Sequence, residues 1–214
     1  MDNAPPPLVL GSTSRYRREL LERLRLPFTV ERPEVDETPA PGETPRTLAL
    51  RLALEKARAV AARHPQAVVI GADQVADLDG EAIGKPGTHD NAVRQLRRMS
   101  GRRVVFQTAL AVLRPATGFE RVELAPVEVH FRTLADAEIE RYLRLEEPYD
   151  CAGSAKCETL GIALLAAIHS DDPTALVGLP LIRTCELLRA AGLDPLRAAA
   201  RSEEHTSELQ SRVD

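Results

Sequence analysis

The stretch Val68–Pro86, VVIGADQVADLDGEAIGKP, decides the fold. The apolar run Ala67–Ile70, at its start, predicts a buried strand that begins one residue earlier and ends at Asp73. The Asp79-Gly80 pair predicts a hairpin turn, after which the chain returns with Lys85. Open α/β sheets place their sites at the carboxyl ends of strands, so a carboxylate here indicates metal binding or proton transfer. The alternative is a structural ion pair between Asp73 and Lys85.

Strands and helices alternate on both sides of this stretch. Leu8–Gly11 and Phe28–Glu31 predict short strands, and a Ser-rich turn and an amphipathic helix follow the first. Long strands are predicted over 104–113 and 120–131. Helices are predicted over 45–63, 91–99, 135–145 and 179–191, and a strand-like segment over 161–168. This mixture indicates the α/β or α+β class.

Composition argues against several classes of protein. The chain has 214 residues, which suits one domain or two small lobes, and a net charge of −4, which disfavours nonspecific nucleic-acid or membrane binding. The basic run Arg94–Arg103 is better explained as a solvated helix face. Three cysteines without a CxxC spacing predict neither a disulfide framework nor a zinc site. With no signal peptide and no membrane span expected, these features indicate a cytoplasmic protein.

The last residues differ from the rest of the chain. The segment Arg201–Ser211, RSEEHTSELQS, has little apolar periodicity and resembles the translation of a sequencing adapter. We therefore expect one domain over residues 1–197 and a disordered or artefactual tail over 198–214.

The Ser-rich turn predicts an anion site. Ser12 or Ser14 can cap the helix that follows, and helix N-termini attract anions. Arg15, Arg17 and Arg18 fall in the first turn, where cations oppose the helix dipole, so a bound phosphate would explain them. The alternative is that the serines only cap and the arginines are solvated.

Two other segments carry weaker signals. Asp36 and Glu37 lie in a Pro-rich loop and can hold Mg²⁺, although a solvated acidic turn is the commoner explanation. The segment Tyr149–Ile162 is rich in small residues, so its backbone can approach a ligand, with Lys156 and Glu158 projecting from it.

In this order, these stretches resemble the Maf family of nucleotide pyrophosphatases, and the resemblance spans about Leu8 to Pro195. Within that family the chain is most similar to the branch that hydrolyses 7-methyl-GTP, on the motifs STSxYRR, ADQV and CAGSxKxE. It departs at Arg15, where many relatives carry proline, and at Thr159-Leu160, where we expect glycine and an aromatic residue. The matching motifs are LGSTSRYRRELL, PEVDETP, LRLALEKA, VVIGADQV, GKP, YDCAGSAKCETLGI and DDPTALVGLPL.

The resemblance implies a Maf/ITPase-like fold, in which helices flank a mixed twisted sheet and two lobes enclose a nucleotide cleft. It also implies hydrolysis of a nucleoside triphosphate with Mg²⁺ or Mn²⁺, and it allows a homodimer. Asp73 would be the general base or a metal-linked carboxylate, and Glu37, with Asp36, would share the metal. The residues implied to bind the triphosphate are Ser12, Arg17, Lys56 and Lys85.

The base pocket follows from the charge of the substrate. The 7-methylguanine ring is cationic and favours stacking on an aromatic ring, for which Tyr16 is the candidate. Glu158 can accept hydrogen bonds from the base, and Gln74 can add another. We therefore predict hydrolysis of 7-methyl-GTP to 7-methyl-GMP and diphosphate. The alternatives are a dTTP/UTP pyrophosphatase of the same family and a non-catalytic nucleotide-binding regulator of cell division.

Overall fold

A mixed seven-stranded sheet forms the centre of the protein, in a computed structural model that describes residues 5–197. The strand order is β2-β1-β3-β5-β6-β7, and β4 pairs with β3. The pairs β1–β2 and β1–β3 are parallel, and the others are antiparallel. The strands are β1 Leu8–Gly11, β2 Thr29–Glu31, β3 Val68–Leu78, β4 Glu81–Ile83, β5 Arg103–Arg114, β6 Phe119–Phe131 and β7 Leu165–His169.

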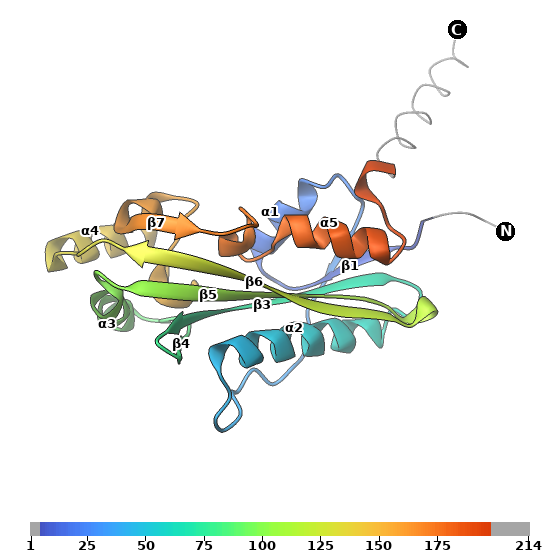
Figure 1. Ribbon diagram of the computed structural model, residues 1–214, viewed down its shortest axis with the longest axis horizontal. Helices are drawn as coiled ribbons and strands as arrows, with labels where there is room; N and C mark the ends of the chain where they lie inside the picture. Colours follow the sequence, from blue (N-terminus) through green and yellow to red (C-terminus); the bar gives the residue numbers. More distant parts are fainter. Residues whose placement is uncertain (1–4, 198–214) are drawn as a thin grey trace, which may run out of the picture.

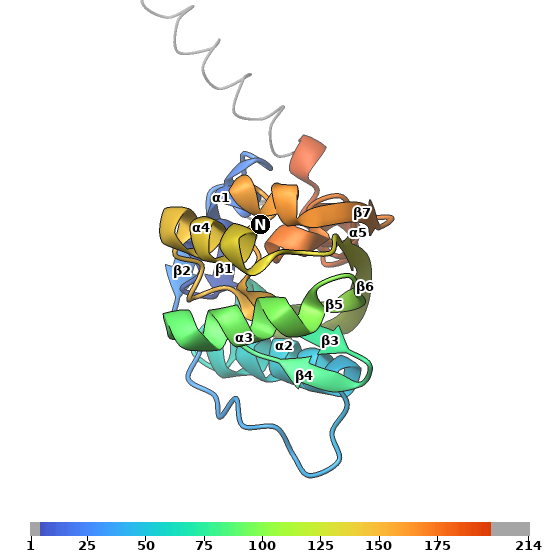
Figure 2. The ribbon, with the colours of Figure 1, turned by 90° about the vertical axis from the view of Figure 1, so that its left-hand side faces the viewer.

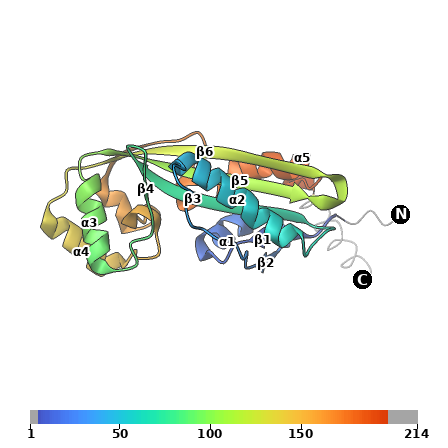
Figure 3. The same cartoon turned by 90° about the horizontal axis from the view of Figure 1, so that it is seen from below.

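Helices cover both faces of this sheet. One face carries α2, and the other carries α1 and α5 (Figure 1). The helices α3 and α4 lie together at the far end of the long strands β3, β5 and β6, so the molecule has two lobes (Figure 3). This is the predicted α/β fold with a mixed, flanked sheet. The helices are α1 Arg15–Glu22, α2 Pro45–Ala61, α3 His89–Met99, α4 Asp136–Glu146 and α5 Leu181–Ala190.

The apolar run at the start of β3 is explained by burial on both faces. Successive side chains of a strand point to opposite faces, so Val69 packs in the α2 cluster while Ile70 packs in the cluster of α1 and α5. Within residues 5–197, no helix is long and apolar enough to cross a membrane. The tail predicted over 198–214 lies outside the described residues.

The strand β3 does not end at Asp73, as the sequence predicted, but continues to Leu78. It continues because β5 pairs with it from Val69 to Asp77, which holds the backbone extended past Asp73. The opposite edge of β3 is interrupted. Along that edge, β1 pairs with β3 only as far as Gly71, and the pairing with β4 starts only at Ala76 of β3. Asp73 therefore lies in an edge gap over residues 72–75, where no strand pairs with this side of β3.

The helix α2 lies directly against the backbone of β3 at Gly71. A Cβ atom on Gly71 would lie 2.3 Å from the Ala53 carbonyl oxygen and 2.6 Å from the Ala57 nitrogen. Both atoms belong to the helix backbone, which cannot rotate away as a side chain can. Only glycine therefore allows this packing, which brings Lys56 of α2 next to the strand.

We expect Gly71→Ala to destabilise the fold by about 1–3 kcal/mol, because the methyl group forces α2 away from β3. Urea unfolding measures the change. Gly84→Ala is the matched control, because a Cβ atom there meets no atom within 4 Å. Equal stability of Gly71→Ala and the wild type would contradict the close approach.

Candidate active site

The ammonium group of Lys56 joins two carboxylates in the edge gap. Its Nζ donates a hydrogen bond to Asp73 Oδ1 at 2.7 Å and forms an ion pair with Glu37 Oε1 at 2.9 Å. Lys56 and Asp73 are only 6% and 7% exposed, whereas Glu37 lies in the loop before α2 and stays open to solvent. The buried partner of Asp73 is therefore Lys56, and the sequence-based alternative of an Asp73–Lys85 pair was wrong.

The pKa values of the Asp73 and Glu37 carboxyl groups are shifted in opposite directions. Burial raises the pKa of Asp73 above its ordinary value, against the attraction of the Lys56 and Arg17 charges. For Glu37, partial burial also disfavours ionisation, but the hydrogen bond from Lys56 and the charges of Lys56, Lys85 and Arg17 hold its pKa below the ordinary value. Relative to an ordinary carboxyl group of its type, Asp73 is therefore the stronger base, whereas the surroundings of Glu37 favour its ionised form.

The start of α1 brings Arg17 to the same place. Ser14 is the N-cap, and its side chain accepts a hydrogen bond from the Arg17 backbone at 3.4 Å. Ser12 is buried, and its hydroxyl accepts from the Ser14 backbone at 3.1 Å and from the Arg17 guanidinium at 3.5 Å. Arg18, by contrast, forms a surface pair with Glu22. The structure thus unites Ser12 and Arg17 near Asp73.

Gln74 points to the opposite face of β3 from Asp73, because the two residues are consecutive on one strand. Its amide nitrogen donates to the Thr108 hydroxyl at 2.9 Å and to the carbonyls of Ala175 and Leu176 at 3.1 and 3.0 Å. These contacts use its donors for the fold, so its Oε1 atom remains to accept a hydrogen bond from a ligand.

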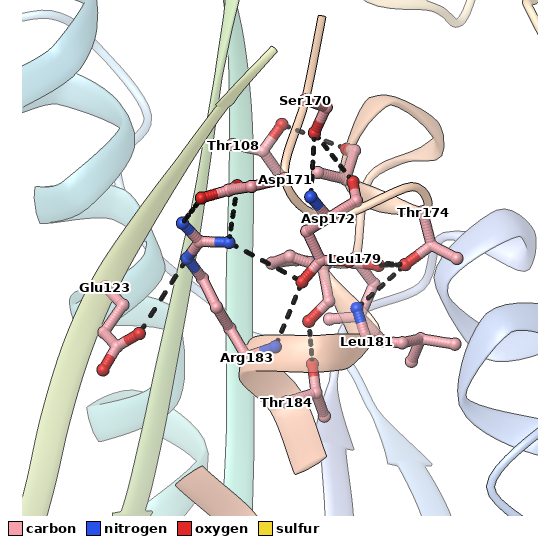
Figure 4. A network of polar contacts seen from close by, with 12 residues as sticks. Thr108, Glu123, Ser170, Asp171, Asp172, Thr174, Leu179, Leu181, Arg183 and Thr184 are labelled. Atoms are coloured by element: carbon pink, nitrogen blue, oxygen red, sulfur yellow. Dashed lines mark hydrogen bonds and ion pairs between the residues drawn. The ribbon is translucent and has the colours of Figure 1, made fainter. Parts of the chain in front are cut away.

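The segment 175–178, which accepts the hydrogen bonds of Gln74, also binds Arg17. The Arg17 Nε donates to the Gly178 carbonyl at 2.9 Å. The fully buried Asp172 fixes this segment (Figure 4). Its carboxylate accepts from the Arg183 backbone of α5 at 3.0 Å and from the Thr174 hydroxyl at 3.4 Å. The Arg183 side chain pairs in turn with Asp171 (Figure 4).

Sequence reasoning assigned no role to Thr108, Asp172 or Gly178. Thr108 carried one signal in the sequence, because it is a polar residue within the mostly apolar strand β5, and the structure buries its hydroxyl fully. The other two lie in the DDPTALVGLPL motif, where Gly178 takes a φ of 124° just before α5. Their partners are distant in sequence, so spacing alone could not identify them.

Asp36 and Lys85 do not join the buried cluster. Asp36 is exposed, and its carboxylate accepts from the Thr38 backbone at 2.9 Å instead of turning toward Asp73. Lys85 is exposed beside a hollow of about 240 Å³ that Asn91 and Arg94 also line. Its charge still reaches Glu37. The predicted metal ligands thus reduce to two converging carboxylates, those of Glu37 and Asp73.

Tyr16 and Glu158 both lie at the segment 149–162. The Tyr16 hydroxyl accepts from Arg15 at 2.8 Å, and the Arg15 guanidinium carbon lies 4.7 Å from the centre of the Tyr16 ring. Tyr16 also contacts Cys151 of that segment. Glu158 is exposed and lines a hollow of about 420 Å³. Neither this hollow nor the one at Lys85 includes Asp73.

A family model described as "Maf-like protein" matches residues 7–191 of this chain, which include all of these site residues.

The chain belongs to the Maf family.

Curated Maf relatives are similar over nearly their whole length. A protein of Polaromonas sp. strain JS666 is 70% identical over 187 residues, covering 87% of this chain and 85% of that protein. One of Albidiferax ferrireducens is 64% identical over 191 residues, covering 89% and 96%. One of Bordetella pertussis is 61% identical over 198 residues, covering 92% and 98%. Each is named "7-methyl-GTP pyrophosphatase". The predicted family is confirmed, and these names agree with the predicted activity.

We expect Lys56→Met to raise the pKa of Asp73 further, because the substitution removes the charge and hydrogen bond that favour the ionised form. A ¹³C NMR titration of the Asp73 carboxyl carbon measures this pKa. Arg58→Met is the control, because Arg58 lies on the same helix but pairs at the surface with Glu120. An unchanged Asp73 titration in Lys56→Met would show that Lys56 does not stabilise the carboxylate.

Proposed function

We propose that this Maf protein hydrolyses 7-methyl-GTP to 7-methyl-GMP and diphosphate. The observation that carries the proposal is the buried Lys56 between Asp73 and Glu37, with Arg17 beside them, at an interrupted sheet edge. A carboxylate beside the phosphates supports hydrolysis because it can accept a proton from the attacking water. The names of the relatives supply the substrate.

Asp73 acts as the general base in this proposal. Lys56 occupies its Oδ1 atom, and within residues 5–197 no side chain or backbone group donates to Oδ2, which can therefore receive a proton from water. The water oxygen bonds to the α-phosphorus as the bond from that phosphorus to the bridging oxygen breaks, and diphosphate leaves. The raised pKa of Asp73 makes this proton transfer more favourable than it is for an ordinary aspartate.

Glu37 and Asp73 are the residues that would hold a divalent cation. The fit rests on their chemistry: two carboxylates already converge on one cationic group, Lys56, and carboxylate oxygens are the ligands preferred by Mg²⁺ and Mn²⁺. Such an ion, when bound, neutralises charge on the phosphates. Asp36 would contribute only after breaking its hydrogen bond to Thr38.

The triphosphate would lie along the start of α1. The first backbone N–H groups of a helix lack partners within it and attract anions. Arg17 is held by Ser12 and Gly178 through two of its nitrogens, which leaves Nη2 for a phosphate oxygen. Lys56 retains one N–H beyond its two carboxylates, and the exposed Lys85 adds a mobile charge at the rim.

We assign the base to Tyr16, Glu158 and the free Oε1 of Gln74. Arg15 already covers one side of the Tyr16 ring, so a cationic base would stack on the other side or displace Arg15. A cytoplasmic location agrees with three free cysteines, and a homodimer remains part of the proposal on family resemblance alone. A dTTP/UTP preference and a non-catalytic regulator of cell division are the competing functions.

The test is release of diphosphate from 7-methyl-GTP, GTP, dTTP, UTP and CTP with Mg²⁺ or Mn²⁺. We expect selective turnover of 7-methyl-GTP and a loss of about 100-fold or more in Asp73→Asn, which cannot accept the proton. Asp36→Asn is the matched control and should retain most activity. Turnover of dTTP and UTP instead would overturn the base assignment, and binding without any turnover would favour the regulator.

We expect Tyr16→Ala to raise KM more for 7-methyl-GTP than for GTP, because stacking favours the cationic ring. The difference in binding free energy between the two substrates should fall by roughly 0.5–2 kcal/mol. Tyr16→Phe retains the ring and should retain the preference. Steady-state kinetics with both nucleotides measures the difference. Equal losses for the two substrates would remove stacking on Tyr16 from the account.

A further inference from the structure

Three metal-ligating side chains meet on the outer strands of the sheet, away from the proposed active site. Glu128 and His130 are two residues apart on β6 and therefore project from one face. His169 of the edge strand β7 is the register partner of Glu128, which places it on that same face. One ligand atom from each of the three residues lies within 4.8 Å of the other two.

This group is separate from the carboxylates of the edge gap. The register runs from Asp77 through Val105 to Glu128, so Glu128 lies two strands from β3. Asp73 lies four residues before Asp77 on β3. At ordinary strand spacings the two places are separated by about 13 Å along the strands and about 10 Å across them.

The ligand types select the kind of ion. Two imidazoles and one carboxylate suit Zn²⁺ and its transition-metal neighbours, whereas Mg²⁺ prefers oxygen ligands alone. The Nε2 of His130 lies 2.7 Å from Glu128 Oε1, and the His130 and His169 rings meet edge to face with centroids 5.5 Å apart. The Glu128 and His130 side chains are 32% and 39% exposed, so an ion can enter from solvent.

We propose that Glu128, His130 and His169 form a binding site for a transition-metal dication of the Zn²⁺ class, which ties the edge strand β7 to β6. A bound ion replaces the proton between His130 and Glu128 and leaves its fourth position to water. No part of this site depends on the proposed hydrolysis of nucleotides.

Arg103 orients the carboxylate for this role. Its guanidinium lies 2.6 Å from Glu128 Oε2, so Oε1 is the oxygen that faces the histidines. The Arg103 hydrogen bond, and then that of His130, lower the pKa of Glu128 to about 2 and keep it ionised. Metal-ligating carboxylates commonly receive such a second hydrogen bond, which fixes their direction.

The experiment is a Zn²⁺ titration of the full chain without a polyhistidine tag, in competition with a chromophoric chelator and with Mg²⁺ in excess. We expect the wild type to bind Zn²⁺ at this site. His130→Gln and His169→Gln should each weaken binding by at least about tenfold. Zn²⁺ should raise the Tm of the wild type more than that of His169→Gln at the same Zn²⁺ concentration, because tighter binding to the folded state gives the larger stabilisation.

The chain provides a matched control in Glu31, Arg63 and His64. There, too, one carboxylate receives both an arginine and a histidine, but no second histidine among residues 5–197 belongs to the group. His64→Gln should therefore bind Zn²⁺ as the wild type does. Zn²⁺ affinities that are equal in the wild type, His130→Gln and His169→Gln would overturn the proposal, as would a wild type that binds no Zn²⁺.

Discussion

The close approach of α2 to β3 at Gly71 is the constraint on which the site depends. Because a hydrogen atom stands where other residues carry Cβ, the helix backbone rests on the strand backbone. This contact carries Lys56 into a buried position where an unpaired ammonium would be costly. Asp73 and Glu37 satisfy it. A packing requirement of one residue thus determines the charge arrangement two residues further along the strand.

The second determinant is the interrupted edge of β3. The chain leaves the sheet after Gly11 to begin α1, and β4 joins the edge only at Ala76. Side chains from both faces of the sheet are therefore accessible at one place, as Asp73 and Gln74 show. Figure 2 shows how the elements stack on the two sides of the sheet, seen from the end of α3 and α4. Under the proposed function, such a gap would let one short strand segment serve a phosphate and a base at once.

Local patterns predicted most of the fold. The apolar runs gave β1, β3, β5 and β6, and the Asp79-Gly80 turn has the positive φ values that a tight hairpin needs. The strand-like segment over 161–168 was placed too early, because its first half forms a 3₁₀ turn and β7 begins at Leu165. Both Asp73 and Lys56 were predicted to be site residues, but their pairing was not predicted, since a contact between a helix and a strand leaves no mark in residue spacing.

The same limit explains the rest of the site. Of the two adjacent acids in the Pro-rich loop, the structure turns Glu37 inward and leaves Asp36 bonded to its own loop. That choice depends on the path of the loop toward α2, which no periodicity encodes. Thr108 and Asp172 act through hydrogen bonds to other segments. Thr108 accepts from Gln74, and Asp172 accepts from the Arg183 backbone. Buried polar residues in apolar surroundings were the available signal, and their partners required the tertiary structure.

The hydrogen bond between Arg17 and Gly178 has a consequence for biosynthesis. These residues lie 161 positions apart, and Gln74 depends on carbonyls of the same late segment. A ribosome releases the chain up to β3 long before it releases that segment. A nascent chain can therefore form β1, α1, α2 and β3 while Arg17 still lacks its anchor. The surroundings of Arg17 are completed by one of the last segments to be synthesised, so a prematurely terminated chain would retain much of the sheet without an ordered Arg17.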